Sequence, residues 1–383
     1  MHGWVVQRRS SILSVRTKLD FPLKMATVNP KKVEFQHGFP LFVPILPKTY
    51  LVKHNKIRVS DIWGFWDYLV KKQTINKGKI DNNFLPTLLE QAKYFYEAAE
   101  AAPLRSQPLL FYYSFLNIAK IVLNINYPYG KDTEYYHGIE TKVDKLTTLD
   151  TAEVSFKQYS GTWSNKISVA KEFFRDMGDT ITIPEVTKIK ALLASCIGIH
   201  RTYSETFNQK ETFYRLGNVS LITKSGKDIV YESELKGIDD AIMADLKASK
   251  GYNIIKMRIG GENRYFYQES HMMLNYNIAK TDWLSLAFRV MQKGIWSYTD
   301  GNEYRLYISK DAIQWSSPSI IYSIMFFFGS ISRYHPYFFE NILNAKEQWL
   351  ISEFMRTQPM QFLYYVTSKV VGNNIYKSRT DSL

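Results

Sequence analysis

Two strongly hydrophobic segments, far apart in the chain, constrain its fold more than any other feature. The first, LLFYYSFLNIAKIVL, follows Ser106 and Pro108, and the second, IIYSIMFFFGSIS, follows Ser317 and Pro318. A serine followed by a proline in the first turn is a pattern that opens a helix. Both segments are apolar on nearly every face, and a helix of that kind must be covered on all sides. We therefore predict that these two helices pack together in one main core.

Shorter patterns predict further helices around this pair. Thr87 and Glu90 form a capping-box pattern behind Pro86, which predicts a helix that stops at Pro103. Helical spacing of apolar residues also predicts helices from Asp61 onward and over residues 184–199, 282–291 and 344–354. His200 and Arg201 directly follow the predicted helix over 184–199. A further apolar segment, 361–371, is expected to pack back on the body of the protein.

Between residues 212 and 309 the pattern changes to alternation with a period of two. The segments FYRLGNVSLIT, DIVYESEL, NIIKMRI, RYFYQE and EYRLYIS are rich in β-branched and aromatic residues, which is typical of strands. The predicted fold class is therefore α+β: a mainly helical core with a strand-rich antiparallel insertion between the central and the C-terminal helices. The expected divisions are a basic leader over 1–24, an extended wrap plus helical core over 25–204, the strand-rich region over 205–310 and C-terminal helices over 311–383.

The charge and the aromatic content of the chain bear on its partners. Lys and Arg number 49 against 36 Asp and Glu, a net charge of +13, beside 27 Tyr, 23 Phe and 8 Trp. Cations beside aromatic rings favour an anionic partner with planar groups, such as single-stranded nucleic acid. The leader holds five basic residues against one acidic residue, a net +4, so part of the excess lies outside the body, and whether translation starts at Met1 or Met25 stays open. A basic surface without a ligand accounts for the same numbers.

Motifs that are missing exclude several classes of activity. The sequence has no GxxxxGK[ST], GxGxxG, HExxH or GxSxG motif, which disfavours the common nucleotide-binding and hydrolase classes. Its single cysteine, Cys196, cannot form an internal disulfide and lies in an apolar stretch, so we expect it to be buried. We predict no metal, no cofactor and no membrane span, because the longest apolar run, 320–331, is shorter than the roughly 18 to 20 residues that cross a bilayer. Cytoplasmic localisation follows as an expectation.

A polar stripe on the first apolar helix is the first candidate site. Tyr113, Asn117, Lys120 and Asn124 follow one another at helical spacing, with Arg105 upstream. Burying an amide and an ammonium group is costly unless partners satisfy them. If the end of the second apolar helix, SRYHPY, and the segment YYHGIE turn toward this stripe, they form an anion site with a histidine for proton transfer. The catalytic candidates are Asn117, Lys120, His137, Arg333 and His335, and His137 and His335 are expected within side-chain reach. The alternative is a structural stripe, with Arg333 and His335 at a helix end where the dipole favours cations.

A predicted hairpin is the second candidate site. With a four-residue loop over 260–263, Ile259 lies opposite Arg264 and Met257 opposite Phe266. The face that remains is basic and aromatic, and it would suit single-stranded nucleic acid because phosphates need cations and bases need planes to stack on. An ordinary exposed strand pair has the same pattern. The predicted nucleic-acid-binding residues are Lys256, Arg258, Tyr265 and Tyr267.

Three blocks of the sequence resemble those of a known family. PLLFYYSFLNIAKIVL, YYHGIE and SRYHPY appear in this order, and with them the chain resembles the YaaC-like family of bacterial proteins over roughly residues 60 to 370. The resemblance implies a bacterial cytoplasmic protein without an assigned reaction, and it brings no catalytic residues. A looser likeness is to HEPN-type ribonucleases, whose pattern is an Arg shortly before a His on a helix. Arg264 and His271 match that spacing, but Arg264 falls in a predicted strand.

Three functions therefore stay open. The leading hypothesis is binding of nucleic acid or another polyanion through a basic aromatic surface. The second is a phosphodiester-acting enzyme built on the first candidate site, and the third is a non-catalytic protein that docks another protein through exposed aromatic residues. The sequence leaves the question of enzymatic activity, the substrate and the oligomeric state undecided.

Overall fold

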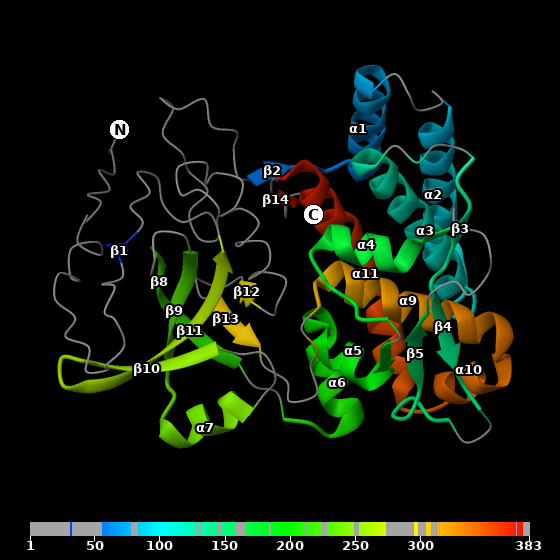
Figure 1. The fold of residues 1–383 in the computed structure, drawn as a ribbon. Helices are drawn as coiled ribbons and strands as arrows, with labels where there is room; N and C mark the ends of the chain where they lie inside the picture. The colour runs from blue at the N-terminus through cyan, green and yellow to red at the C-terminus, as the bar shows by residue number, and fades with distance from the viewer. Residues whose placement is uncertain are drawn as a thin grey trace, which may run out of the picture.

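A computed structural model shows a helical part and a separate sheet (Figure 1). The leader and the predicted helix over 282–291 lie outside the residues that it describes. The described residues are 31–32, 56–77, 83–127, 129, 132–144, 147–157, 166–183, 185–210, 213–223, 228–248, 253–272, 295–297, 304–307, 313, 315–372 and 374–377.

Within the described residues, helices build the main core and mostly antiparallel strands form the sheets, so the α+β prediction is confirmed. The helices are α1 (Ile62–Lys77), α2 (Phe84–Ala101), α3 (Gln107–Asn126), α4 (Val169–Met177), α5 (Ile189–Ser195), α6 (His200–Phe207), α7 (Asp240–Ala248), α9 (Ser317–Tyr334), α10 (Pro336–Leu343) and α11 (Glu347–Val371).

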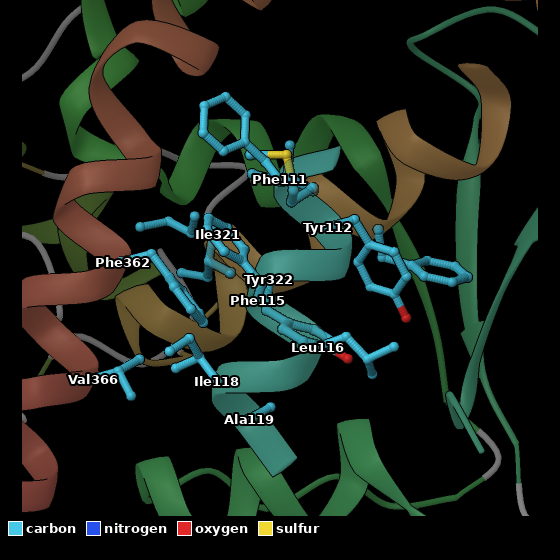
Figure 2. Packing of buried hydrophobic residues seen from close by; sticks show 14 of the residues in the cluster. Phe111, Tyr112, Phe115, Leu116, Ile118, Ala119, Ile321, Tyr322, Phe362 and Val366 are labelled. Atoms are coloured by element: carbon cyan, nitrogen blue, oxygen red, sulfur yellow. The ribbon is translucent and has the colours of Figure 1, made fainter. Parts of the chain in front are cut away.

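The two apolar helices, α3 and α9, pack against each other as predicted. They approach closely at Gly329, where an added Cβ would lie 3.1 Å from the Pro108 carbonyl oxygen and 3.2 Å from Tyr112 Cβ. On another side of α3, the rings of Phe115 and Phe362 stack with centroids 3.9 Å apart, which joins α11 to the same core (Figure 2). Segments from both ends of the described chain thus share one hydrophobic core.

Helix α3 is the one helix in the described part of the chain that is long and apolar enough to cross a membrane. In its most apolar window 78% of the residues are buried inside the protein. Its hydrophobic surface is therefore covered by α2, α9 and α11 rather than left exposed.

Short strand pairs lie at the border of the helical part, and two of them hold the loop that follows α3 in place. Their positions place His137 between β3 and β4, beside the N-terminus of α4. The pairs are β3 (Tyr135–Tyr136) with β6 (Ile167–Ser168), β4 (Ile139–Lys142) with β5 (Glu153–Phe156) and β7 (Glu185–Lys188), and β2 (Lys56–Arg58) with β14 (Asn374–Tyr376).

A larger antiparallel sheet holds the strand-rich region. The His200 ring at the start of α6 meets this sheet, with its centroid 4.9 Å from that of Phe213 and 5.7 Å from that of Tyr307. The strand order is β10-β11-β9-β8-β13-β12, with β1 also paired to β8. Its strands are β1 (Lys31–Lys32), β8 (Phe213–Thr223), β9 (Asp228–Lys236), β10 (Asn253–Ile259), β11 (Glu262–Met272), β12 (Ile295–Ser297) and β13 (Tyr304–Tyr307).

The predicted helix over 184–199 is wrong in its first turn and at its end. Residues Glu185–Lys188 form strand β7, which pairs with β5, and α5 then runs only to Ser195. The chain breaks at Cys196, and His200 begins α6 instead of ending a helix. A free strand edge on β5 outweighed the local helical periodicity, and Val186 in β7 is exposed.

Two other boundaries differ from the sequence expectation. Helix α2 begins at Phe84 after Asn83, so Thr87 lies inside it and donates to the Asn83 carbonyl at 2.7 Å instead of capping the helix. Helix α11 is continuous through Pro359, where we expected two segments. Residues on both sides of that proline, among them Phe354 and Phe362, pack into the same hydrophobic core. This packing compensates for the backbone hydrogen bond that the proline removes.

Candidate anion-binding site

The end of α9, one stripe of α3 and the loop after β3 bring three basic side chains together. Lys120, His137 and Arg333 form the basic cluster: Arg333 binds the Tyr113 hydroxyl, His137 contacts the hydroxyl of the adjacent Tyr112, and Lys120 lies over the ring of Tyr135, two residues before His137. Each comes from a separate element, so the cluster exists only because α3 and α9 cross closely and the β3–β4 loop lies against them.

Arg333 is held at the exposed end of α9 by aromatic residues. Its Nη1 donates to the Tyr113 hydroxyl at 2.8 Å, and its guanidinium carbon lies 5.0 Å from the centre of the Tyr334 ring. The Tyr113 ring packs in turn on Phe95 of α2, with centroids 5.4 Å apart. The guanidinium is therefore positioned by neutral partners and keeps its charge free for a ligand.

Lys120 is half-buried and lies against an aromatic ring. Its Nζ is 5.6 Å from the centre of the Tyr135 ring, and burial lowers the pKa of the ammonium group below its usual value. Asn124 fixes that ring, because its Nδ2 donates to the Tyr135 hydroxyl at 2.7 Å and to the Lys120 carbonyl at 2.8 Å. No carboxylate pairs with Lys120 among the residues that the structure describes.

The imidazole of His137 is held by a hydrogen bond at Nδ1, and the residue is also partly exposed to solvent. Its Nδ1 contacts the buried Tyr112 hydroxyl, and its carbonyl accepts the Ala170 amide at 3.1 Å. Burial, and then the charges of Lys120 and Arg333, lower the pKa of this imidazole from 6.5, so it is neutral at pH 7. Figure 2 shows Tyr112 on the side of α3 away from Phe362, where its ring is buried at the edge that meets His137.

A glycine makes the approach of this loop possible. Gly138 has a φ of +73°, a backbone conformation that side chains rarely adopt, and an added Cβ would lie 1.8 Å from Ser168 Oγ. Ser168 itself caps α4 by accepting the Lys171 amide at 3.3 Å. The loop after His137 is therefore fitted to the start of α4 with no room for a side chain.

Nearby carboxylates are engaged with other cations. Glu340 of α10 holds Arg105 in a bidentate pair, with contacts of 2.6 and 2.7 Å. Glu134 pairs with Lys166 at 2.8 Å, and Glu140 pairs with Lys157. Within the described ranges no ion pair neutralises Lys120 or Arg333, so the basic cluster keeps a positive potential, and Arg105, first placed beside the stripe, is already satisfied.

Two predicted members of the site have other contacts. Asn117 is buried and its Nδ2 donates to Gln91 of α2 at 3.5 Å, which is a weak bond at the limit of the distance range. His335 lies at the break between α9 and α10, where its amide donates to the Ile331 carbonyl and its carbonyl accepts the Phe339 amide. Among the described residues no hydrogen bond or ring contact joins His335 to His137, and their proximity stays a prediction.

The predicted hairpin forms, but another helix covers its basic and aromatic face. A two-residue turn, Gly260 and Gly261 with φ of +61° and +87°, replaces the predicted four-residue loop, and Lys256 pairs with Tyr265. This register differs from the predicted one by two residues, which leaves each side chain on the predicted face.

Helix α7, which the sequence pattern did not reveal, packs on β10 and closes that face. Asp240 binds Lys256 Nζ at 2.6 and 2.7 Å and accepts the Tyr265 hydroxyl at 3.0 Å. Tyr265 and Tyr267 are 5% and 1% exposed, so neither is available for stacking on a base, whereas Lys256 and Arg258 stay exposed. The sequence signal for α7 was Asp239 directly before its start, since Asp239 Oδ1 accepts the Ile242 amide at 2.8 Å as a helix cap.

Other expected chemistry can also be placed. Arg264 and His271 both lie in β11, a strand where the ribonuclease pattern needs a helix, and Arg264 lies 3.6 Å from Glu234.

Cys196 is buried and its thiol donates to Gln358 at 3.1 Å, and burial raises its pKa, so it is no nucleophile. In the part of the chain that the structure describes, no group of three or more His, Cys, Asp or Glu is arranged to hold a metal ion.

The arrangement defines an α+β protein with a helical core and a positively charged cluster at the crossing of its two most apolar helices. The family model described as YaaC-like Protein matches residues 45–370, and the chain belongs to that family. The match includes all three residues of the basic cluster. Comparisons with curated proteins and with solved structures found no match.

Proposed function

We propose that the protein binds a phosphate-bearing anion at the basic cluster. One observation carries this proposal: Lys120, His137 and Arg333 lie together, and no described carboxylate pairs with Lys120 or Arg333. Two cations that both lower the pKa of one imidazole, with no described carboxylate paired to either, favour the binding of an anion. A phosphate group fits because Arg offers a fork of donors and Lys a compact charge.

His137 would take part as a proton donor once the anion is bound. The two cations and burial lower its pKa in the free protein, and a bound negative charge acts in the opposite direction. With Tyr112 on Nδ1, the other ring nitrogen, Nε2, is left to serve the ligand. Binding would therefore be coupled to uptake of a proton by His137.

The test is isothermal titration with inorganic tripolyphosphate at low salt. We expect the variant Lys120→Met with Arg333→Gln to lower the affinity about 100-fold or more, because each charged hydrogen bond contributes roughly 1.5–3 kcal/mol. Arg356→Gln is the matched control, since it removes the same charge from the exposed Arg356 of α11. Equal affinity of the double variant and the wild type would refute the proposal.

A phosphodiester-acting enzyme is the second candidate. The observation that favours it is a neutral imidazole beside two cations, since such an imidazole can accept a proton from an attacking hydroxyl while the cations stabilise charge on the phosphate. Incubation of labelled single-stranded RNA with wild type and with His137→Gln checks it. Cleavage by the wild type that His137→Gln lacks is the expected result for an enzyme, and intact RNA in both leaves binding as the function.

A further inference from the structure

We infer that the anion bound at the basic cluster is the backbone of a single-stranded nucleic acid whose bases stack on Tyr334 and Tyr337. This inference rests on the proposed function and adds the class of ligand. It starts from exposure: Tyr337 is 87% and Tyr334 is 63% exposed, the two highest values among the large hydrophobic residues exposed in the described part of the chain.

The two rings lie next to the cation of the cluster. Tyr334 directly follows Arg333, whose guanidinium is 5.0 Å from the Tyr334 ring centre, and Tyr337 comes one residue after the Pro336 that opens α10. A phosphate bound by Arg333 therefore brings the attached nucleotides to the tyrosines. Aromatic planes beside a basic groove or patch are the elements by which proteins bind single strands without reading their sequence.

The backbone holds this platform rigid although its side chains are exposed. The His335 amide donates to the Ile331 carbonyl at 2.9 Å, the Phe339 amide donates to the His335 carbonyl at 3.0 Å, and Pro336 fixes the first turn of α10. Arg105 braces the same corner, since its carbonyl accepts the Ser332 hydroxyl at 2.8 Å and its guanidinium binds Glu340. A base that stacks here loses little to ordering of the protein.

Neighbouring residues distinguish this surface from an apolar docking patch. Ser332, Arg333 and His335 adjoin Tyr334 in the sequence, and Glu340 follows Tyr337 by about one turn of α10, so the elements that carry the two rings also carry polar groups. A protein partner would have to leave Lys120 and Arg333 without a counterion or supply acids of its own. A nucleic acid single strand supplies phosphates and planes together. A duplex has its bases already stacked on one another, so it offers the phosphates but not free base faces.

The experiment measures fluorescence anisotropy of labelled oligouridylate, its duplex with oligoadenylate, and competition by tripolyphosphate. We expect Tyr334→Ala with Tyr337→Ala to lower the affinity for oligouridylate by on the order of 5- to 100-fold, the range for loss of one stacked base or more. Tyr337→Ala alone, which keeps the contact between Arg333 and the Tyr334 ring, should also lower the affinity for oligouridylate while leaving the affinity for tripolyphosphate unchanged. Phenylalanine at both positions should keep the affinity, and Tyr68→Ala, which removes an exposed ring from α1, is the control.

The outcomes separate this inference from the proposed function. Unchanged oligouridylate affinity in the alanine double variant, or equal affinity for duplex and single strand, overturns stacking while binding of tripolyphosphate still supports the anion site. Failure of the wild type to bind either ligand overturns both. Loss of a copurifying protein from the alanine double variant, with oligouridylate affinity intact, assigns the tyrosines to a protein contact and also overturns the inference.

Discussion

The basic cluster and the hairpin face contain the same kinds of residue and differ in what covers them. Both place lysine or arginine beside tyrosine. On the hairpin, Asp240 of α7 neutralises Lys256 and binds the Tyr265 hydroxyl, and the two tyrosines are buried. At the end of α9, Arg333 is bound by a neutral tyrosine, and Tyr334 and Tyr337 face solvent. A basic aromatic pattern in sequence therefore indicates a ligand surface only where no third element supplies a carboxylate.

Replacing one glycine in each region should give the largest changes in the free energy of unfolding. Gly329→Ala should lower the free energy of unfolding by about 1–3 kcal/mol, because the new methyl group meets backbone atoms of α3 at 3.1–3.3 Å. It should also weaken tripolyphosphate binding, since α9 carries Arg333. Gly260→Ala in the hairpin turn meets nothing within 4 Å and suffers only from its φ of +61°, about 1–2 kcal/mol.

Urea denaturation measures both variants, with Gly260→Asn as the control because asparagine tolerates a left-handed conformation in this type of turn. The comparison would fail if Gly260→Ala weakened tripolyphosphate binding as much as Gly329→Ala did, because the hairpin would then be coupled to the anion site.

A dependence on pH is the next largest effect. The folded free protein has a lowered His137 pKa, so it binds fewer protons than the unfolded chain and loses stability as the pH falls below about 6.5. Anion binding raises this pKa, so the affinity for oligouridylate, whose phosphodiesters do not titrate in this range, should increase as the pH falls, by at most about tenfold per pH unit.

His137→Gln should make that affinity nearly constant between pH 5 and 8, as measured by anisotropy at fixed salt. The wild type tests the sign: affinity that rises with pH would mean that His137 is not protonated on binding. No histidine lies opposite Lys256 or Arg258 in the register of the hairpin, so Lys256→Met should leave the pH profile unaltered.

Removal of the carboxylate from the hairpin should have the smallest effect. Asp240→Asn frees Lys256, yet Tyr265 and Tyr267 remain buried, so the affinity for oligouridylate should change less than about threefold, as for a screened surface charge. Anisotropy at low salt measures it, with Asp67→Asn on α1 as the control, because Asp67 also pairs with a lysine. A large gain in affinity would show that the hairpin is a masked binding surface.

Much of the fold could be predicted because its signals are local. The apolar segments after Ser106 and before Arg333 dictate central helices, since no other arrangement hides a helix that is hydrophobic all round. The alternation around Lys256 and Tyr265 assigned each side chain to its correct face, because a shift of two residues preserves the faces of a strand. Strand β7 and helix α7 were missed, since the first depends on pairing with the distant β5 and the second is short.

The sequence by itself determined the α+β class, the family, the two central helices and three of the residues that gather at their crossing, Lys120, His137 and Arg333. Only the tertiary structure decided that no described carboxylate pairs with Lys120 or Arg333 while Lys256 acquires Asp240, and that Tyr334 and Tyr337 are exposed while Tyr265 and Tyr267 are buried. The reason is physical: hydrophobic periodicity acts along one element, whereas the neutralisation of a charge and the covering of a ring depend on whatever other element packs within a few ångströms.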